Sequence, residues 1–240
     1  MTTPSDTSRF RDLTIDAFLD RIASSDPVPG GGSAAAVAAA LGAGLVTMVA
    51  ALSTGRPRYA AHESVLGWAA QTGRLLSDRF LDLAQEDADA FSGFAAAMKL
   101  PRETDEQIAD RTAAIQTAAR QAAEIPMRCV QACVQLVVAA EALAGRSNAN
   151  ASSDLNVAAL LGEAAARGAA ANVLVNLPAM GDPETEGSLM VEVDGRLREI
   201  DSLVASVRQV VASGEPRDPV QPGILDVGPR GQADSSPVSG

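Results

Sequence analysis

Asp87 is the residue whose type and position most clearly suggest chemistry. It falls in an apolar series whose members are three or four residues apart, the spacing of one helix face: Leu76, Phe80, Leu83, Asp87, Phe91, Phe94 and Met98. A carboxyl among apolar side chains loses hydration, which raises its pKa and suits it to proton transfer near neutral pH. The alternative is a structural aspartate that pairs with a buried arginine or caps a neighbouring helix. The sequence leaves both open.

A glycine-rich loop precedes the longest uncharged stretch of the chain. Gly30, Gly31 and Gly32 follow two prolines and lead to Ser33, whose hydroxyl is expected to cap a helix starting at Ala34. Free N–H groups at a helix start suit a carboxylate, so this loop is a candidate substrate contact. It has no lysine and no preceding strand, which argues against a P-loop or a dinucleotide fingerprint. The alternative is a hinge that permits close helix packing.

Three polar residues share one face of the helix expected after the polar loop 146–152: Asp154, Asn172 and Asn176. Asp154 and Asn172 would be ~27 Å apart along the axis, so they would serve two ends of a long ligand, or two sites. The alternative places Asp154 in the first turn, where its charge favours the helix dipole, and lets the asparagines bond to neighbouring helices. Arg56 is a candidate for holding an acidic substrate, although a surface arginine would also fit.

Metal and thiol chemistry find little support in the sequence. Cys129 and Cys133 are four residues apart in a helical stretch, and we expect two small buried side chains rather than a disulfide or a metal site. The single histidine, His62, cannot supply the paired Glu-x-x-His of a carboxylate-bridged metal bundle. We therefore expect no metal and no cofactor, and an enzyme, if the protein is one, that works with carboxylates.

Composition narrows the class of protein. The net charge is −11 and no basic stripe occurs, so nucleic acid is not an expected partner. Residues 34–52 are uncharged and near the minimum length of a membrane span, but they are rich in alanine and lack flanking aromatic or basic clusters. We expect a buried helix and no membrane. The polar N-terminus and the two cysteines indicate a cytoplasmic protein.

The pattern of the chain predicts an all-α fold, a bundle of long helices around the central alanine- and glycine-rich helix. That helix has no polar face, so other elements should cover it all round. The expected helices cover residues 14–25, 34–53, 60–100, 104–144 with a kink at Pro126, 152–177 and 182–213. We expect one helical domain over residues 1–213 and a disordered Pro/Gly-rich tail over 214–240.

Several of these segments occur together, in this order and at similar spacing, in one known family. They are Pro29–Ser33 with its helix, Gly55-Arg56 with Tyr59, Asp87–Phe91, Ser153-Asp154-Leu155 and Asn172–Leu177. Over about residues 14–211 the chain resembles the cyclodeaminase/cyclohydrolase family of folate enzymes. One departure is Pro57, where relatives have a basic residue.

The resemblance implies an all-helical homodimer whose substrate is a one-carbon derivative of tetrahydrofolate, with Asp87 as the catalytic residue. The candidate substrate-binding residues are then Gly30, Gly31, Gly32, Ser33, Arg56, Tyr59, Asn148, Ser153, Asp154, Asn172 and Asn176. Two reactions remain open: a cyclodeaminase that forms 5,10-methenyltetrahydrofolate and ammonia from the 5-formimidoyl compound, and a cyclohydrolase that interconverts 5,10-methenyl- and 10-formyltetrahydrofolate. The competing hypothesis is a non-catalytic helical module that binds folate or a partner enzyme.

Overall fold

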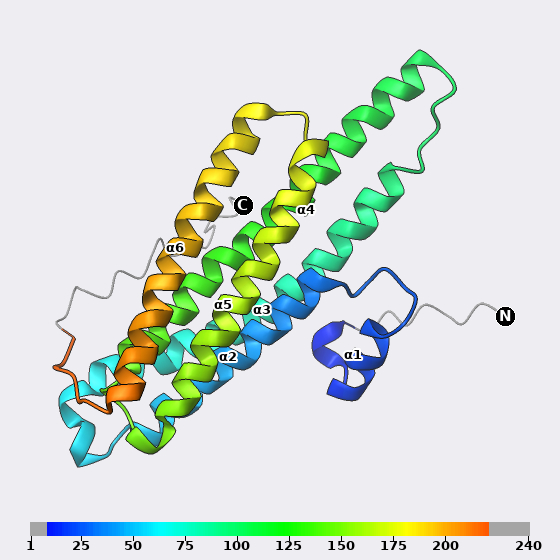
Figure 1. Cartoon of the computed structure of the whole chain (residues 1–240). Coiled ribbons are helices and arrows are strands. Elements are labelled where there is room, and N and C mark those ends of the chain that lie inside the picture. Colours follow the sequence, from blue (N-terminus) through cyan, green and yellow to red (C-terminus); the bar gives the residue numbers. More distant parts are fainter. Residues whose placement is uncertain (1–8, 221–240) are drawn as a thin grey trace, which may run out of the picture.

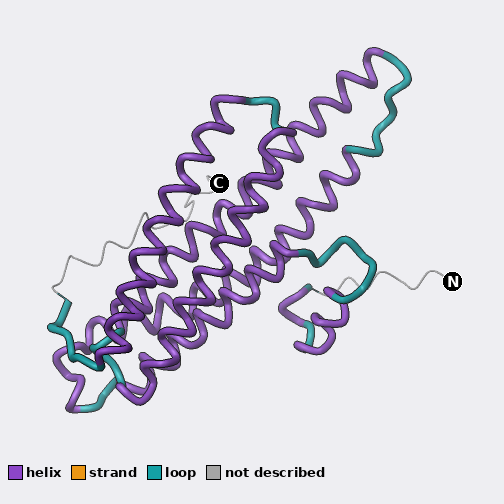
Figure 2. The backbone as a smooth tube through the Cα atoms, in the orientation of Figure 1, coloured by secondary structure: helices purple, strands orange, loops and turns teal. Residues whose placement is uncertain are grey.

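A computed structural model describes residues 9–220, and in this range the chain is an all-α bundle (Figures 1 and 2). The long helices run nearly side by side, and the short first helix lies against one side of the bundle (Figure 1). The α-helices are α1 (Ile15–Ile22), α2 (Gly31–Ser53), α3 (Glu63–Ala97), α4 (Asp105–Leu143), α5 (Ser152–Asn176) and α6 (Pro183–Ser213). Short 3₁₀ segments lie between α2 and α3 (Pro57–His62), between α4 and α5 (Ala149–Ala151) and between α5 and α6 (Leu177–Ala179), and a further one, Phe10–Asp12, precedes α1.

The glycine- and alanine-rich helix α2 packs directly against α3, α4 and α5. Glycines allow this close packing. A Cβ added at Gly73 of α3 would lie 2.3 Å from Thr47 Oγ1 and 2.7 Å from the Ala43 carbonyl oxygen of α2. On the other side, a Cβ at Gly42 would lie 3.1 Å from the Ala158 carbonyl oxygen of α5. The backbones of three helices therefore approach so closely that larger side chains do not fit between them.

Several helix ends follow their sequence signals. Thr104 and Gln107 form a capping box at the start of α4. Asp182 caps α6, with its carboxylate accepting from the Thr185 N–H, and α6 is continuous through Gly187 and Gly195. Gly145 ends α4 with a φ of 74°, a conformation that favours glycine.

The cap expected at Ser33 is wrong, and the start of α5 also has no serine cap. Helix α2 begins at Gly31 with Gly30 as its N-cap, so Ser33 lies inside the first turn rather than before it. The Ser33 hydroxyl donates to the Ala84 carbonyl oxygen of α3 instead, because α3 lies within reach. Helix α5 begins at Ser152 with Ala151 as its N-cap, so neither Ser152 nor Ser153 caps it. The residue that does cap here is Asn148, one turn earlier, where its side chain accepts from the Asn150 N–H.

Residues 9–220 of one chain do not cover α2 on all sides, contrary to the expectation from the sequence. Leu41, Met48 and Leu52 are exposed along one side of α2, opposite the side that packs on α3. The ends of α3 and α4 that are joined to each other also project beyond the start of α2 as a hairpin (Figure 1). Phe91 and Met98 are therefore exposed, although they continue the buried series that contains Leu76, Phe80 and Leu83.

Three segments are long and apolar enough to cross a membrane by length and composition: Gly31–Ser53, Asp105–Leu143 and Ala149–Ala179. Within the bundle, 44 %, 61 % and 44 % of their most apolar windows are buried, respectively. The absence of a membrane partner therefore stays a prediction from the sequence.

The segment 214–220 follows α6 and turns back over the end of α4. The Arg217 N–H donates to the Gly145 carbonyl oxygen, and the Arg217 guanidinium binds the Glu141 carboxylate. Arg146 is buried beneath this segment and donates to the Asp218 carbonyl oxygen. The rest of the tail expected from the sequence, residues 221–240, lies outside the described residues.

The close contact of α2 with α3 gives a test of the packing. Gly73→Ala should lower the free energy of unfolding by roughly 1–3 kcal/mol, because its Cβ would overlap Thr47 and Ala43. Gly67→Ala in the same helix meets nothing within 4 Å and should raise stability by about 0.5–1 kcal/mol through helix propensity. Urea unfolding followed by circular dichroism measures both. Equal effects of the two substitutions would contradict the packing described here.

Candidate active site

The Asp87 carboxyl lies at the start of α2, where α3 leaves the bundle core. Its Oδ2 is 3.1 Å from the Ser33 hydroxyl, and the same hydroxyl is 2.8 Å from the Ala84 carbonyl oxygen. Ser33 is fully buried, and Asp87 is half-buried. The periodicity of the sequence therefore predicted the direction of Asp87 correctly.

Gly32 makes this contact possible. A Cβ at Gly32 would lie 2.3 Å from Asp87 Oδ1 and 2.6 Å from Asp87 Cγ. The carboxyl consequently occupies the space in which any other residue would place its side chain. The second of the three glycines in the loop differs, since a Cβ at Gly31 would meet nothing within 4 Å.

Burial raises the pKa of Asp87 above the ordinary aspartate value. Hydrogen bonds from the Ser33 hydroxyl and the Ser33 backbone N–H offset part of this increase, because they stabilise the carboxylate. Within residues 9–220 no arginine forms an ion pair with Asp87, whereas the adjacent Glu86 pairs with Arg79. The alternative of a structural aspartate neutralised by arginine therefore has no support in the geometry, whereas the other alternative, a cap on a neighbouring helix, fits the bond from the Ser33 N–H in the first turn of α2.

Ser33 allows the Asp87 carboxyl to change its protonation state. A hydroxyl has one proton, so Ser33 can donate it to Asp87 or to the Ala84 carbonyl oxygen. When Asp87 is protonated, its own O–H can donate to Ser33 Oγ, and Ser33 keeps its bond to Ala84. Both forms of the carboxyl thus have a partner, as a group that alternately takes and gives a proton requires.

The asparagines of α5 lie at the same end of the bundle. Helices α2 and α5 are antiparallel, since Gly42 lies against Leu161 whereas Gly168, later in α5, lies against Ala35, earlier in α2. Asn172 follows Gly168 by one turn. The Asn172 amide donates to the Gly168 carbonyl oxygen. The Asn176 amide donates to the Ala122 carbonyl oxygen of α4, which makes it a link between helices, the structural role weighed in the sequence.

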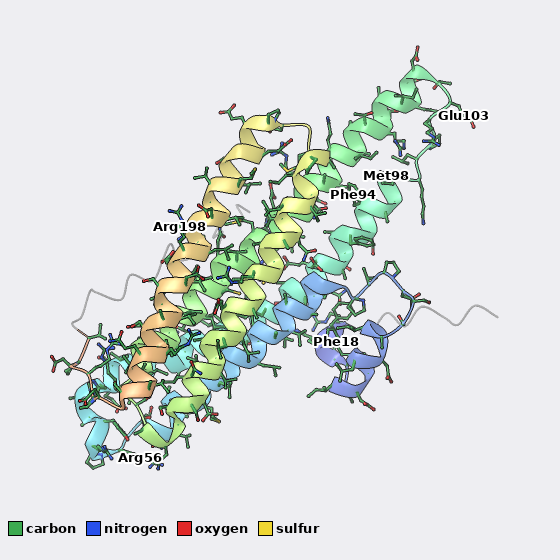
Figure 3. The ribbon with its side chains drawn as sticks, in the orientation of Figure 1. Phe18, Arg56, Phe94, Met98, Glu103 and Arg198 are labelled. Atoms are coloured by element: carbon green, nitrogen blue, oxygen red, sulfur yellow. The ribbon has the colours of Figure 1, made fainter. Side chains whose placement is uncertain are left out.

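The remaining candidates lie at the opposite end of α2. Figure 3 shows Arg56 at one end of the bundle and Phe94, two turns beyond Asp87, toward the other. Helix α2 alone separates Gly30 from Arg56 by ~35 Å. The residues on the Arg56 side are Arg56, Tyr59, Asn148, Ser153 and Asp154. One chain therefore does not bring all the expected substrate-binding residues together.

A cavity of about 220 Å³ lies at this far end, between the start of α5 and the end of α6. Tyr59 and Asn148 line it, and so do His62, Ser147 and Arg58, which sequence reasoning did not select. Burial lowers the pKa of His62, whose Nδ1 is buried without a hydrogen-bond partner. Only the position of His62 next to the Gly55–Tyr59 motif could have drawn attention to it.

Over residues 9–220 no group of three or more His, Cys, Asp or Glu side chains is arranged to hold a metal ion. Cys129 and Cys133 are buried free thiols that contact each other, as expected from their spacing.

Comparison with known proteins shows to which family this chain belongs. The family model of formiminotransferase-cyclodeaminase matches residues 14–195. A methenyltetrahydrofolate cyclohydrolase from Methylorubrum extorquens is 37 % identical over 200 residues, which cover 83 % of this chain and 96 % of the relative. The chain belongs to the formiminotransferase-cyclodeaminase family. It is a folate enzyme of the cyclodeaminase/cyclohydrolase type, and the resemblance inferred from the motifs is confirmed.

Two further relatives define the extent of the likeness. The formimidoyltransferase-cyclodeaminase of Rattus norvegicus is 34 % identical over 196 residues, which are 82 % of this chain but only 36 % of the rat protein. The crystal structure of a formiminotetrahydrofolate cyclodeaminase from Thermotoga maritima superimposes with a TM-score of 0.77 at 26 % identity, covering 85 % of this chain and 98 % of that one. The family's all-α fold is therefore confirmed over most of the chain.

The contact between Gly32 and Asp87 yields a test of the site. Gly32→Ala should lower kcat/KM by roughly 100-fold, because the new Cβ displaces the carboxyl by about 1 Å or more. Gly93→Ala, on the same helix as Asp87 but with nothing within 4 Å, should change activity less than about threefold. Circular dichroism checks that both variants fold. Full activity of Gly32→Ala would show that the carboxyl position does not matter.

Proposed function

We propose that this protein is a methenyltetrahydrofolate cyclohydrolase, with Asp87 as general base and then general acid. The observation that carries the proposal is a carboxyl with a raised pKa that is held between Gly32 and Ser33 without an arginine. The relative from Methylorubrum extorquens supports this reaction, since the likeness covers nearly all of that protein.

The proposed reaction needs one group that moves protons at a tetrahedral carbon. Asp87 takes a proton from water while the water oxygen bonds to the methenyl carbon between N5 and N10. Asp87 then gives this proton to N5 as the bond from carbon to N5 breaks. The remaining hydroxyl loses its proton to solvent and becomes the formyl carbonyl on N10, so one water is consumed and one proton released. The Ser33 hydroxyl keeps Asp87 hydrogen-bonded in both states.

The cyclodeaminase reaction is the second candidate, favoured by the fold likeness to the Thermotoga maritima enzyme. N10 of 5-formimidoyltetrahydrofolate would bond to the formimidoyl carbon, and Asp87 would take the N10 proton. Asp87 would then protonate the leaving nitrogen, which departs as ammonia and leaves the methenyl bridge. The two reactions share a tetrahedral carbon between N5 and N10, so one carboxyl could serve either.

The same proposal includes the location, the oligomeric state and the ligands of the enzyme. We expect a cytoplasmic homodimer that binds a tetrahydrofolate derivative as substrate, without metal or cofactor, nucleic acid or membrane. The Gly30–Gly32 backbone or the Arg56 guanidinium would hold the glutamate carboxylates of the folate.

Asp87→Asn should lower turnover by at least about 100-fold, since an amide can neither take nor give the proton. Helix content and folate binding should stay largely intact, because the amide has nearly the same shape. The measurement is the loss of methenyltetrahydrofolate absorbance with purified protein, together with ammonia release from the formimidoyl substrate. Near-normal turnover would refute the role of Asp87. A wild-type protein that binds folate but catalyses neither reaction would be a binding module instead.

The dependence of activity on pH tests the proton transfer itself. If Asp87 acts first as a base, the enzymatic rate should rise with pH and level off above a pKa higher than that of an ordinary aspartate. Ser33→Ala removes a hydrogen bond that lowers the pKa of Asp87, so the inflection should move to higher pH. Rates corrected for uncatalysed hydrolysis give both profiles. An inflection that stays in place in Ser33→Ala, or moves to lower pH, would argue for another base.

A further inference from the structure

Residues 214–220, which we call the C-terminal strap, cover one end of the bundle. Gly214 ends α6 with a φ of 67°, and the chain then turns back over the end of α4. Figure 1 shows this segment in orange-red, at the same end of the bundle as the Pro57–His62 turn. The strap lies beyond residues 14–195, which the family model matches. Its contacts are therefore not implied by membership of the family.

Few contacts hold the strap in place. The Arg217 N–H donates to the Gly145 carbonyl oxygen, and the Arg217 guanidinium binds the Glu141 carboxylate. Arg217 and Val220 are half-buried, whereas most other residues of the strap are exposed. A segment that buries so little surface can open while the bundle stays folded.

Beneath the strap lies a buried guanidinium without a carboxylate partner. Arg146 is 8 % exposed, and it donates to the carbonyl oxygens of Ala142 and Asp218. Within the described part of the chain it forms no ion pair, and the nearby Glu141 carboxylate pairs with Arg217 instead. Burial and the charge of Arg217 lower the pKa of Arg146. A carboxylate would bind this guanidinium more strongly than a carbonyl oxygen does, since it is charged and accepts two parallel hydrogen bonds.

The cavity of about 220 Å³ described above adjoins this guanidinium. Gly145 and Ser147, the residues on either side of Arg146, both line it. The strap also forms part of its wall, through Gly214 and Glu215. An opening of the strap would therefore connect Arg146 with the cavity.

The lining of the cavity suits a ligand that is partly polar and partly apolar. Tyr59, His62 and Asn148 contribute a hydroxyl, an imidazole and an amide, and Val210 contributes an apolar surface. The cavity is also larger than the roughly 150 Å³ that hold benzene in an engineered protein core. A ring or a short chain with polar substituents would therefore fit.

The strap already places acidic residues where an anion would bind. The Asp218 carbonyl oxygen accepts from Arg146. The Asp218 carboxylate is close enough to Arg146 and His62 to oppose the lowering of their pKa values by burial. Glu215 lines the cavity next to them. An incoming anion would have to replace these groups, so the strap and the ligand exclude each other.

We propose that the C-terminal strap is a lid that competes with a carboxylate ligand for Arg146. When the strap opens, the carboxylate of the ligand binds the Arg146 guanidinium, and the rest of the ligand occupies the cavity beside Tyr59 and His62. The strap thereby sets the affinity, because a pocket that is open only part of the time binds more weakly in proportion to the open fraction. The ligand is a free amino acid or the glutamate end of a folate, and only the second choice rests on the proposed function.

Two truncations measure the effect of the lid. Chain 1–213 lacks the strap, whereas chain 1–220 keeps it and loses only the residues that follow. In titration calorimetry with L-glutamate and with p-aminobenzoyl-L-glutamate, chain 1–213 should bind at least one probe roughly 10-fold more tightly than chain 1–220. The full chain should bind like chain 1–220. Equal affinities of the two truncations, weaker binding by chain 1–213, or binding of neither probe to it would overturn the proposal.

Two variants of the full chain keep the proposal testable if chain 1–213 does not fold. Arg217→Ala removes the ion pair with Glu141 and should tighten probe binding by roughly 3- to 10-fold. The control is Arg208→Ala on α6, whose exposed side chain makes no ion pair among residues 9–220. It should leave the affinity unchanged. Folded variants with equal affinities would contradict a lid.

A third pair of variants asks whether Arg146 holds the ligand. Arg146→Gln, combined with whichever of the two open forms folds, should weaken probe binding by at least about 10-fold. Arg74→Gln removes the same charge from an exposed position on α3 and should change the affinity less than about twofold. Circular dichroism checks that both variants keep their helix content. Equal binding by the two would show that the carboxylate lies elsewhere and refute the assignment.

The probes also distinguish the two sources of the carboxylate. Similar binding of both probes would indicate a free amino acid, and binding of p-aminobenzoyl-L-glutamate alone would indicate the end of a folate. None of these measurements needs turnover. A lid that controls binding in a protein that catalyses neither folate reaction would support this inference and refute the proposed function. An active enzyme whose truncations bind the probes equally would do the opposite.

Discussion

The close approach of α2 to α3 is the constraint on which the rest of this structure depends. Gly73 allows the two backbones to meet at one point, and Gly32 allows the Asp87 carboxyl to fill the space beside the first turn of α2. A carboxyl in that position is partly desolvated, yet it faces the Ser33 hydroxyl and N–H groups. Small residues therefore do more here than permit dense packing. They determine where the half-buried Asp87 carboxyl lies and how strongly it holds its proton.

Much of this arrangement follows from the sequence because helical periodicity is a strong signal. The spacing from Leu76 to Phe91 shows which way Asp87 points, and the caps at Thr104 and Asp182 show where two helices begin. Residues such as Gly32 and Gly73 were harder to interpret. A glycine in a sequence shows only that the position has no side chain. The atom that occupies this space belongs to a neighbour more than twenty residues away, which the sequence does not identify.

The errors in the sequence prediction have a common cause, which is competition from tertiary contacts. Ser33 fits the chemistry of an N-cap, but its hydroxyl donates to the Ala84 carbonyl oxygen of α3, and Gly30 takes the cap position. Likewise, the polar residues around Arg56 and Asn148 belong to the same set of family motifs as Asp87, but within one chain the full length of α2 separates them from it. Sequence order gives no information on which ends of a bundle meet in an assembly.

The irregular segment 214–220 has a consequence for how this chain reaches its final form. Arg217 is more than seventy residues downstream of Gly145 and Glu141, the groups that it binds. During synthesis the end of α4 therefore lacks these contacts until nearly the whole bundle has left the ribosome. Until then Arg146, which is buried in the final structure, stays solvated. The opposite end depends on contacts between α2 and α3, such as the bond of Ser33 to Asp87, 54 residues apart, which can form before α4 has been synthesised. The part of the molecule that carries the acid is thus assembled first, and the end around Arg146 is closed last.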